Sequence, residues 1–236
     1  MLKMTQLSQI YRTEVVETHA LRDFSLHVRE GEFVAVTGPS GSGKTTFLTI
    51  AGLLEEYSSG EYQLDGRNVR GLSDAQRSHL RNEKIGFIFQ AYNLISDLNV
   101  QENIEVPLRY RGMRSAERRA RVHEVLERVG LTARAKHYPA ELSGGQQQRV
   151  AIARALAGSP RLMLADEPTG NLDTHMARGV MELLEELHRD GSTIVMVTHD
   201  PDLAARAQRE VRIIDGQVVD LETPPRLIQG GISAHI

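Results

Sequence analysis

Three short runs of consecutive apolar residues stand out in this chain, at residues 33–36, 162–165 and 194–197. Each is bounded by polar or turn-forming residues. A brief, unbroken apolar run of this kind is typical of a strand buried on both faces of a parallel sheet. Chemically capable residues follow each run directly. Because ligands bind at the carboxyl ends of strands in open α/β sheets, the pattern predicts an α/β fold with its functional residues at that edge.

Helical patterns alternate with these runs. One helix is expected to open at residues 43–44 and to reach about residue 53. Another covers roughly residues 174–189 and is closed by Gly191, because glycine is favoured just past a helix end. A third begins at Asp200-Pro201, a capping residue followed by proline at the first helical position. The alternation of strands and helices supports the α/β assignment.

Between about residues 91 and 159 the signals become mostly helical, which predicts a helical subdomain inserted between strands of the core. Residues 115–129 carry an apolar face made of Val122, Val125, Leu126 and Val129. The same helix has a basic face made of Arg114, Arg118, Arg119 and Arg121. We interpret this basic face as a solvated helix surface, in preference to a contact with phospholipid or RNA.

The remaining segments complete one domain. Residues 5–28 and 60–65 have the pattern of a smaller antiparallel sheet. The predicted organisation is a single domain over residues 1–221. Within it, residues 1–90 and 160–221 form a nucleotide-binding core with the antiparallel β subdomain, and residues 91–159 form the helical subdomain. Residues 222–236, with two prolines and two glycines, are expected to be a poorly ordered tail.

Composition narrows the function classes. The net charge of −3 argues against a surface built mainly to hold nucleic acid. No cysteine is present, which excludes a disulfide framework and a thiolate metal site. No stretch approaches the ~18 to 20 apolar residues of a membrane helix, and the first residues lack the apolar core of a secretory signal. We therefore expect any membrane role to come through a partner.

The first apolar run leads into a phosphate-binding loop with the pattern G-x-x-x-x-G-K-[ST]. Glycines let backbone N–H groups turn toward anionic oxygens, and the following helix adds the positive end of its dipole. Lys44 is expected to contact the β and γ phosphates, and the Thr45 hydroxyl to bind Mg²⁺. The predicted nucleotide-binding residues here are Gly38, Pro39, Ser40, Gly41, Ser42, Gly43, Lys44, Thr45 and Thr46.

The second apolar run ends in Asp166-Glu167-Pro168. An acid at the end of a hydrophobic strand is the arrangement that places a carboxylate on the Mg²⁺ side of a phosphate loop, which is the role expected for Asp166. Glu167, next in the chain, is expected to orient and polarise the water behind the γ-phosphate. An Asp-Glu pair is usually surface charge, but the four apolar residues before this pair favour the functional interpretation.

A second glycine-rich segment, Leu142-Ser143-Gly144-Gly145-Gln146, follows later in the chain. Ser143 and the glycines open a helix that is predicted to reach about residue 157, so their N–H groups and hydroxyl offer a second anion site. Folding this site onto the phosphate loop of the same chain is hard to arrange, whereas a neighbour's copy fits. The two motifs together predict that ATP is bound by a pair of subunits.

Together with Gln90, Asn171-Leu172-Asp173 and Thr198-His199, these motifs resemble the ATPase subunit of an ABC transporter over nearly the whole chain. The resemblance implies a P-loop NTPase (RecA-like) core with a small antiparallel β subdomain and an inserted helical subdomain. It also implies ATP and Mg²⁺ as cofactors and hydrolysis of ATP to ADP and phosphate. Two subunits would pack head to tail as a homodimer, with each ATP between the phosphate loop of one subunit and the LSGGQ segment of the other.

Matching the family motifs residue by residue implies further roles. Tyr11 matches the aromatic residue that stacks on adenine, Gln90 the glutamine that senses Mg²⁺ and the membrane partner, and His199 the histidine that contacts the γ-phosphate. Taken alone, Tyr11 also fits an ordinary strand tyrosine and His199 a surface histidine. The implied catalytic residues are Glu167, His199, Lys44 and Gln90. The implied metal site contains Thr45, Gln90 and Asp166. The implied contacts to the partner's ATP are Ser143, Gly144, Gly145, Gln146 and Asp173.

Further patterns resemble one branch of the family, which holds the ATPases of lipoprotein release, macrolide export and cell division (LolD, MacB, FtsE). The glycine-asparagine pair before Leu172-Asp173 departs from the Ser-Ala that is more frequent in amino-acid importers. The same branch is matched by residues 16–21, 86–90, 93–94, 102–103 and 107–108. This resemblance implies a peripheral protein on the cytoplasmic face of the cell membrane that drives export, lipoprotein extraction or mechanotransmission. The membrane part is expected to be a separate permease, or to have been removed from a fused chain.

Two other functions stay open from the sequence. One is the motor of an amino-acid-type importer, against which Gly170-Asn171 argues. The other is an ABC ATPase of DNA repair or translation, which would carry a long coiled-coil insertion or a second cassette. Neither fits in 236 residues, and the net charge of −3 adds no support for nucleic acid. The motifs describe the nucleotide chemistry and not the cargo, which the partner would handle.

Overall fold

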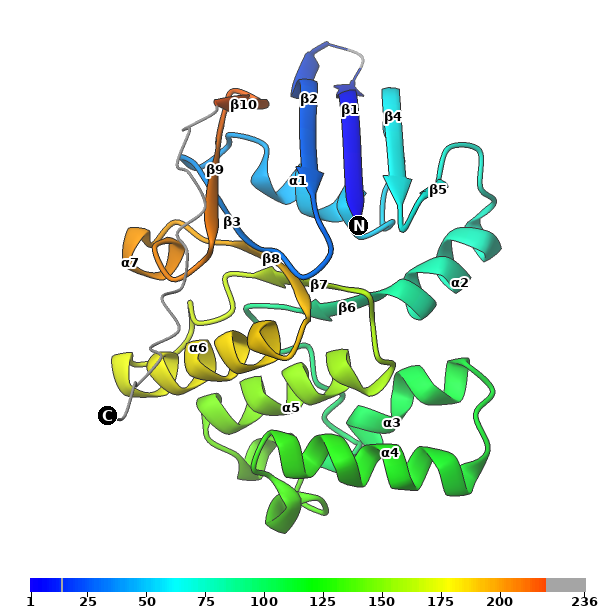
Figure 1. Ribbon diagram of the computed structural model, residues 1–236, viewed down its shortest axis with the longest axis vertical. Helices are drawn as coiled ribbons and strands as arrows, with labels where there is room; N and C mark the ends of the chain where they lie inside the picture. Colours follow the sequence, from blue (N-terminus) through cyan, green and yellow to red (C-terminus); the bar gives the residue numbers. More distant parts are fainter. Residues whose placement is uncertain (14, 220–236) are drawn as a thin grey trace, which may run out of the picture.

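The structure is a computed structural model of the chain, in which residues 1–13 and 15–219 are described. A six-stranded sheet forms its centre, in the order β10-β9-β3-β8-β7-β6 (Figure 1). The strands β3 (Phe33–Thr37), β8 (Thr193–Val197), β7 (Leu162–Asp166), β6 (Ile85–Ile88) and β9 (Arg209–Ile214) are parallel, and β10 (Gln217–Val219) is antiparallel to β9. The predicted tail, residues 222–236, lies outside the described residues.

The three apolar runs of the sequence are the three neighbouring strands β3, β8 and β7. Alternate side chains of each strand enter two different hydrophobic cores. Along β3, Phe33 and Ala35 lie in a core shared with the helices α3 to α6, whereas Val34 and Val36 lie in a core shared with α1 and the second sheet. Because both faces are covered, both sets of positions must be apolar, which explains the unbroken runs.

The second sheet is antiparallel and has the order β2-β1-β4-β5. It contains β1 (Leu2–Arg12), β2 (Glu17–Val28), β4 (Ser59–Leu64) and the short β5 (Arg67–Asn68). Helix α1 (Lys44–Ala51) buries Phe47, Leu48 and Ile50 in the core between the two sheets. This helix ends at Ala51, before the predicted residue 53, and Gly52 follows as its C-cap.

Helix α6 (Thr174–Arg189) has the predicted bounds, and Gly191 adopts the left-handed conformation (φ +96°) that suits glycine after a helix. The short helix α7 (Pro201–Ala204) begins after its cap Asp200, as predicted. Helix α2 (Asp74–Lys84) was not predicted. Its signal was the capping box in which Ser73 and Gln76 bond each other's backbone N–H groups.

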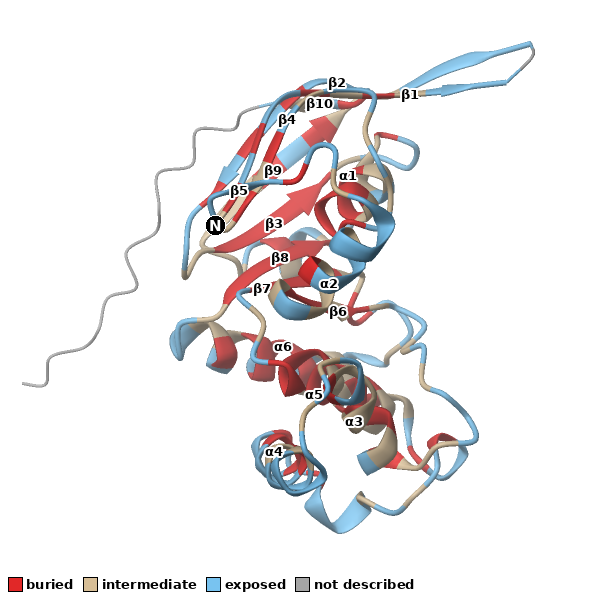
Figure 2. Ribbon diagram, turned by 90° about the vertical axis from the view of Figure 1, so that its right-hand side faces the viewer, coloured by how far each residue is buried: buried red, intermediate tan, exposed pale blue. Residues whose placement is uncertain are grey.

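Helices α3 (Val100–Tyr110), α4 (Ser115–Arg128) and α5 (Gly144–Ala157), with short 3₁₀ turns at Thr132–Arg134 and Pro139–Glu141, form the helical part of the structure. In Figures 1 and 2 these helices lie on the side of the central sheet that faces away from the second sheet. The predicted apolar face is buried in the core that α4 shares with α3 and α5, and consists of Val122, Val125, Leu126 and Val129.

The interpretation of the basic face as wholly solvated is wrong for two of its four arginines. Arg118 donates to a carboxylate oxygen of Glu105 at 2.5 Å. Arg121 donates to the backbone carbonyls of Leu156 and Ala157 at the end of α5, at 3.0 Å each. These two arginines connect α4 to its neighbouring helices, whereas Arg114 and Arg119 are exposed.

Candidate functional site

The predicted chemical residues follow four adjacent strands at one edge of the central sheet. Strand β3 is followed by the phosphate loop, β8 by Thr198-His199 and β6 by Phe89-Gln90, while β7 ends in Asp166 and is followed by Glu167. Because β3, β8, β7 and β6 are consecutive and parallel, these segments meet at the same edge. The fold therefore brings together residues that are up to 161 positions apart in the sequence (His199 and Gly38, 199 − 38).

The phosphate loop needs glycine at two positions. Gly38 and Gly43 have φ values of +150° and +103°, and a Cβ atom on either would lie within 2.4 Å of a backbone carbonyl oxygen. A Cβ at Gly41 would meet no atom of residues 1–13 or 15–219 within 4 Å, so within the described part of the chain this side of the loop is open. The hydroxyl oxygen of Ser42 is buried and has no hydrogen-bond partner within the described residues. An open, glycine-rich loop with an orphan hydroxyl fits an anionic oxygen ligand.

Lys44 begins α1, and its ammonium group folds back over the loop. It donates to the carbonyl oxygens of Gly38 and Pro39, both at 2.8 Å. The charge of Lys44 also reaches the neighbouring strand ends. Burial raises the pKa of Asp166 and the hydrogen bond to Glu167 raises the pKa of His199, and Lys44 opposes both shifts. Thr45 follows Lys44 in the first turn of α1, where the helix dipole is positive. The phosphate loop thus places positive charge beside Asp166, which ends β7, and Glu167, which follows it.

Asp166 and Glu167 are neighbours in sequence but have different surroundings. Burial, with the adjacent charge of Glu167, raises the pKa of Asp166, while Lys44 opposes this shift. Glu167 has a left-handed backbone (φ +43°), which is uncommon for a residue with a side chain. A cation beside Asp166 would relieve the burial of its charge. The oxygen donors available here, on Thr45, Gln90 and Asp166, are of the kind that Mg²⁺ prefers.

The carboxylate of Glu167 is held by the end of β8. Its Oε1 lies 2.7 Å from the Nδ1 of His199 and accepts the His199 backbone N–H at 3.1 Å. Its Oε2 accepts the hydroxyl of Thr198 at 3.3 Å. Hydrogen bonding and charge from Glu167 raise the pKa of His199. Glu167 and His199 therefore form one hydrogen-bonded unit at the strand ends, and not two independent site residues.

Gln90 contacts the segment that follows Glu167. Its side-chain amide donates to the Oδ1 of Asn171 at 3.3 Å, and the Asn171 amide donates back to the Gln90 carbonyl at 3.0 Å. At Gly170 a Cβ would lie 2.6 Å from the Nε2 of Gln90. Sequence reasoning used Gly170-Asn171 only to choose a branch of the family; the structure shows that both residues shape the environment of Gln90.

The LSGGQ segment begins α5 with a complete capping box. The Ser143 hydroxyl accepts the Gln146 N–H at 3.4 Å, and the Gln146 side chain accepts the Ser143 N–H at 3.0 Å. Gly145 packs against Met176 of α6, the helix that Asp173 caps through the N–H of Met176 at 2.8 Å. Asp173 and the LSGGQ segment are therefore neighbours. Asp173 and Ser143 are exposed, whereas Leu142 and Gly145 are buried.

The LSGGQ segment and the phosphate loop do not meet within one copy. In Figures 1 and 2 the central sheet and α6 lie between the beginning of α1 and the beginning of α5. Across residues 1–13 and 15–219, no hydrogen bond joins residues 143–146 to residues 38–46. The structure thus has two separate helix N-termini of the predicted anion-binding kind.

Tyr11 is the next-to-last residue of β1, near the turn to β2, and the end of the β1–β2 hairpin projects from the body of the molecule (Figure 2). Its side chain is 38% exposed, so a face of the ring is accessible. Its hydroxyl donates to Glu55 at 2.8 Å. Glu55 was missed by sequence reasoning, because a Glu-Glu pair after a helix looks like surface charge and carries no motif.

Residues 21–170 match the sequence family described as ABC transporter. The chain belongs to the ABC transporter family. As a member, it is an ATP-binding, ATP-hydrolysing cassette with Mg²⁺ as the accompanying ion, and the predicted family, fold class, cofactors and reaction are confirmed at that level.

Two proteins of nearly the same length are similar to this chain. YvrO of Bacillus subtilis, an uncharacterized ABC transporter ATP-binding protein, is 47% identical over 93% of this chain and 96% of its own length. The dimeric structure of the ATP-binding cassette MJ0796 in a post-hydrolysis state with ADP and Pi superposes with a TM-score of 0.84. It is 43% identical and covers 92% of this chain and 96% of that chain.

Longer relatives match through part of their length. The macrolide export ATP-binding/permease protein MacB of Mannheimia succiniciproducens is 46% identical over 93% of this chain, which spans 34% of that protein. The pyoverdine export ATP-binding/permease protein PvdT of Pseudomonas fluorescens is 49% identical over 86% of this chain, which spans 31% of it. Among the described residues, no helix is both long enough and apolar enough to cross a membrane.

Proposed function

We propose that two copies of this chain pack head to tail around two molecules of ATP, and that their association and separation drive a membrane permease for export. The observation that carries this proposal is the placement of the LSGGQ segment. It is a helix N-terminus with an exposed serine cap, Ser143, that its own copy holds away from the phosphate loop. A second copy turned head to tail would bring that N-terminus to the loop. The dimeric cassette MJ0796 supports this arrangement.

In the proposed site, each residue acts on the triphosphate from a defined strand end. Lys44 and the N–H groups of the loop bind the β and γ phosphates. Thr45, Gln90 and Asp166 would hold Mg²⁺, which would supply positive charge beside the phosphates. Glu167 orients the attacking water and polarises it, because its carboxylate is fixed by Thr198 and His199. His199 holds this carboxylate and contacts the γ-phosphate.

Residues of the partner complete the site. Ser143, Gly144, Gly145 and Gln146 are proposed to bind the partner's ATP, and Asp173 to transmit its state. The contact of Gly145 with Met176 on the helix capped by Asp173 supports this, because a movement of one segment displaces the other. We take residues 91–159 as the helical subdomain that moves with the LSGGQ segment.

A groove beside Gln90 is the proposed docking site of the permease. Its volume is about 710 Å³, and it lies between the α2–β6 segment and helices α3 and α5. The stacked rings of Phe87 and Phe89 (centroids 5.2 Å apart) and the 83% exposed Tyr110 form its aromatic walls. Docking here would connect the permease to Gln90, and would place the chain on the cytoplasmic face of the membrane.

Export is the direction supported by the comparisons. MacB and PvdT are named as export proteins that combine an ATP-binding part with a permease, and this chain spans about a third of the length of each. An amino-acid-type importer is the second candidate. The contacts of Gly170 and Asn171 with Gln90 argue against it, because the Ser-Ala of importers cannot make the amide pair.

Complementation between two inactive variants tests the head-to-tail dimer. Lys44→Ala removes the loop cation, and Ser143→Arg fills the LSGGQ site; each homodimer then has two damaged sites. A mixed dimer has one intact site, made of the loop of one chain and the LSGGQ segment of the other. We expect the mixture to hydrolyse ATP faster than either variant alone. If the mixture stays as inactive as its parents while Ser143→Arg alone loses ATP binding, each chain would hold ATP by itself.

The permease contact is tested separately. Tyr110→Asp places a charge in the groove wall and is expected to release the chain from membranes that contain its permease, without changing ATP affinity. Arg119→Asp is the control, because Arg119 is exposed on α4 and does not line the groove. Equal membrane association of the wild type and both variants would mean that the groove is not the docking site.

A further inference from the structure

We propose that Glu55 is the positioning residue for Tyr11, holding its ring at a set place relative to the phosphate loop and so determining how tightly the adenine base is bound. This inference rests on the proposed function, in which Tyr11 stacks on the base and Lys44 binds the triphosphate. It assigns a role in base recognition to a carboxylate that belongs to none of the nucleotide-binding motifs.

Three side chains donate to the carboxylate of Glu55. The Tyr11 hydroxyl donates to its Oε2 at 2.8 Å, and the Thr49 hydroxyl donates to the same oxygen at 3.2 Å. The Gln9 amide donates to Oε1 at 3.4 Å. Charge-assisted bonds of this kind are stronger than neutral ones, and a ring bonded through its hydroxyl has less freedom to rotate. Glu55 is therefore well placed to fix Tyr11.

These bonds join the two ends of the nucleotide site. Thr49 lies on α1, the helix whose first residues are Lys44 and Thr45 of the phosphate loop. Glu55 follows the same helix and reaches across to Tyr11 on β1. Glu55 thus connects Tyr11 to α1, and α1 leads directly from the phosphate loop. A nucleotide that spans both ends gains more affinity when their separation is fixed before it binds, because less ordering is then needed on binding.

Tyr11 has little other support. Pairing of β1 with β4 ends at Ser8, and beyond that residue only β2 pairs with β1. From this point the loop after α1 bonds to β1 in place of β4. The Ser58 backbone N–H donates to the Ser8 carbonyl and the Ser58 hydroxyl accepts the Ile10 N–H, both at 3.0 Å. The hairpin then projects from the body (Figure 2). Without Glu55, the ring would sit on a two-stranded projection.

The same surroundings raise the pKa of the Tyr11 hydroxyl. Burial raises the pKa of Tyr11 and Glu55 raises it further, whereas Thr46 and Gln9 act in the opposite direction. A protonated hydroxyl is the form that can donate to the carboxylate. Thr46 lies in α1 next to the phosphate loop, so its influence on Tyr11 is a second sign that this ring lies beside that helix.

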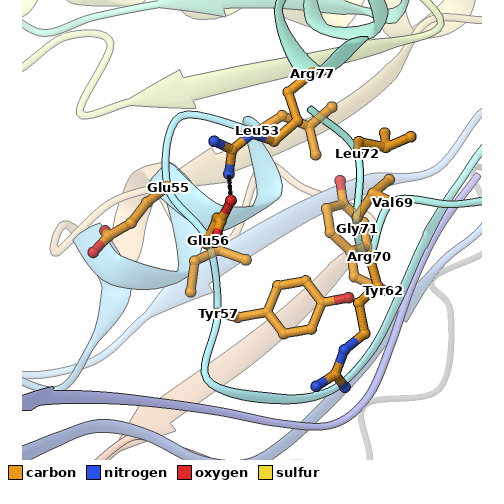
Figure 3. A pocket seen from close by; sticks show the side chains of 11 residues that line it. Leu53, Glu55, Glu56, Tyr57, Tyr62, Val69, Arg70, Gly71, Leu72 and Arg77 are labelled. Atoms are coloured by element: carbon orange, nitrogen blue, oxygen red, sulfur yellow. Dashed lines mark ion pairs between the residues drawn. The ribbon is translucent and has the colours of Figure 1, made fainter. Parts of the chain in front are cut away.

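The adjacent Glu56 provides a matched control. Figure 3 shows the two carboxylates pointing in different directions from consecutive residues. Glu56 faces Arg77 at 2.7 Å beside a cavity of about 280 Å³ that Leu53, Tyr57, Tyr62 and Arg70 also line. Glu55 also lines this cavity, but its carboxylate points away from that of Glu56 (Figure 3) and accepts the Tyr11 hydroxyl. Substitution of either glutamate by alanine removes one negative charge from the same loop, but of the two only Glu55 bonds Tyr11.

The experiment compares ATP with inorganic tripolyphosphate, which has no base. Glu55→Ala is expected to weaken ATP binding about fivefold, and less than Tyr11→Ala, because it removes the orientation of the ring and not the ring itself. Tripolyphosphate binding should not change. Tyr11→Phe removes the hydrogen bond between Tyr11 and Glu55 from the tyrosine side, so its ATP affinity should match that of Glu55→Ala. The double variant Tyr11→Phe/Glu55→Ala should bind ATP no more weakly than either single variant. Glu55→Gln keeps an acceptor and should bind ATP almost as the wild type does, as should Glu56→Ala.

A steady-state readout separates positioning from a general loss of structure. The KM for ATP should rise with kcat retained, as expected when binding shared by ground state and transition state is lost. If the wild type does not bind ATP, the proposed function fails. If Tyr11→Ala weakens ATP binding and Tyr11→Phe and Glu55→Ala do not, only the role of Glu55 is overturned. The same holds if Glu55→Ala weakens ATP and tripolyphosphate equally. Should Glu55→Ala not fold, Tyr11→Phe alone decides between these outcomes.

Discussion

The Nδ1 atom of His199 lies 2.7 Å from the Oε1 atom of Glu167, and the backbone N–H of the same histidine donates to the same oxygen at 3.1 Å. One residue thus binds the carboxylate twice, once through its ring and once through its backbone. The backbone bond does not involve the ring. It would therefore continue to orient the Glu167 carboxylate if the His199 ring rotated to contact another group. This arrangement suits a carboxylate that must hold a water molecule in place.

Substitution of Glu167 separates binding from hydrolysis. Glu167→Gln preserves the size of the side chain and removes its charge, so we expect ATP affinity to be retained and the hydrolysis rate to fall by about 10²- to 10⁴-fold. Single-turnover hydrolysis and equilibrium ATP binding measure the two effects. We also expect a stable ATP-bound dimer of this variant, detectable by light scattering with saturating Mg-ATP. A monomeric variant under these conditions would contradict the dimer.

The pH dependence of stability reports on the same pair. Glu167 raises the pKa of His199 above its ordinary value of 6.5 in the folded state. The pair therefore stabilises the fold fully below the unfolded-state pKa, and this contribution is lost as the pH rises through the folded-state pKa. We expect His199→Gln to lower the free energy of unfolding more at about pH 5.5 than at about pH 8.5. Because the His199 side chain is 74% exposed, the difference will be small.

An NMR titration of His199 without nucleotide tests the cause of this shift. The pKa of His199 should be lower in Glu167→Gln than in the wild type, because the hydrogen bond to a charged acceptor and the charge itself are both removed. The same pKa in both proteins would show that another group is responsible.

Gly170 is predicted to tune the use of Mg²⁺. In Gly170→Ala, the new Cβ would lie 2.6 Å from the Nε2 of Gln90, at the far end of a flexible side chain, so Gln90 moves and the fold is kept. We expect the free energy of unfolding to change by no more than about 0.5 kcal/mol. The Mg²⁺ concentration for half-maximal ATPase activity should rise, as in Gln90→Ala. An unchanged Mg²⁺ requirement in both variants would remove Gln90 from the metal site.

Asn103, part of the pattern that resembled one branch of the family, has a structural role. It is fully buried, and its side-chain nitrogen lies within hydrogen-bond distance of the carbonyls of Ile95, Leu98 and Asn99, while its side-chain oxygen accepts the Ile95 N–H at 2.8 Å. In Asn103→Ala the carbonyls of Ile95 and Asn99 would keep their backbone N–H donors, but the Ile95 N–H and the Leu98 carbonyl would lose the Asn103 side chain as a partner. We expect this to cost about 2–4 kcal/mol in the free energy of unfolding. Urea denaturation measures this. A variant as stable as the wild type would show that water satisfies the loop instead.

The nucleotide chemistry of this protein was readable from its sequence. The phosphate loop, the Asp166-Glu167 pair and the LSGGQ segment are each contiguous, because each acts through backbone N–H groups or adjacent side chains at one strand or helix end. The apolar runs predicted β3, β7 and β8 for the same reason, since burial on both faces leaves a local pattern. The roles implied for individual site residues stay predictions until the variants above are measured.

The connections between these motifs were decided only by the tertiary structure. Glu55 approaches Tyr11, Asn171 pairs with Gln90 and Arg121 binds the end of α5 across 44, 81 and about 35 positions of the chain. Glutamate, asparagine and arginine in such positions look like ordinary surface residues, because a polar side chain leaves no periodic signal. Their partners are set by how the second sheet and the helices pack on the central sheet, and that packing depends on the whole core rather than on any one segment.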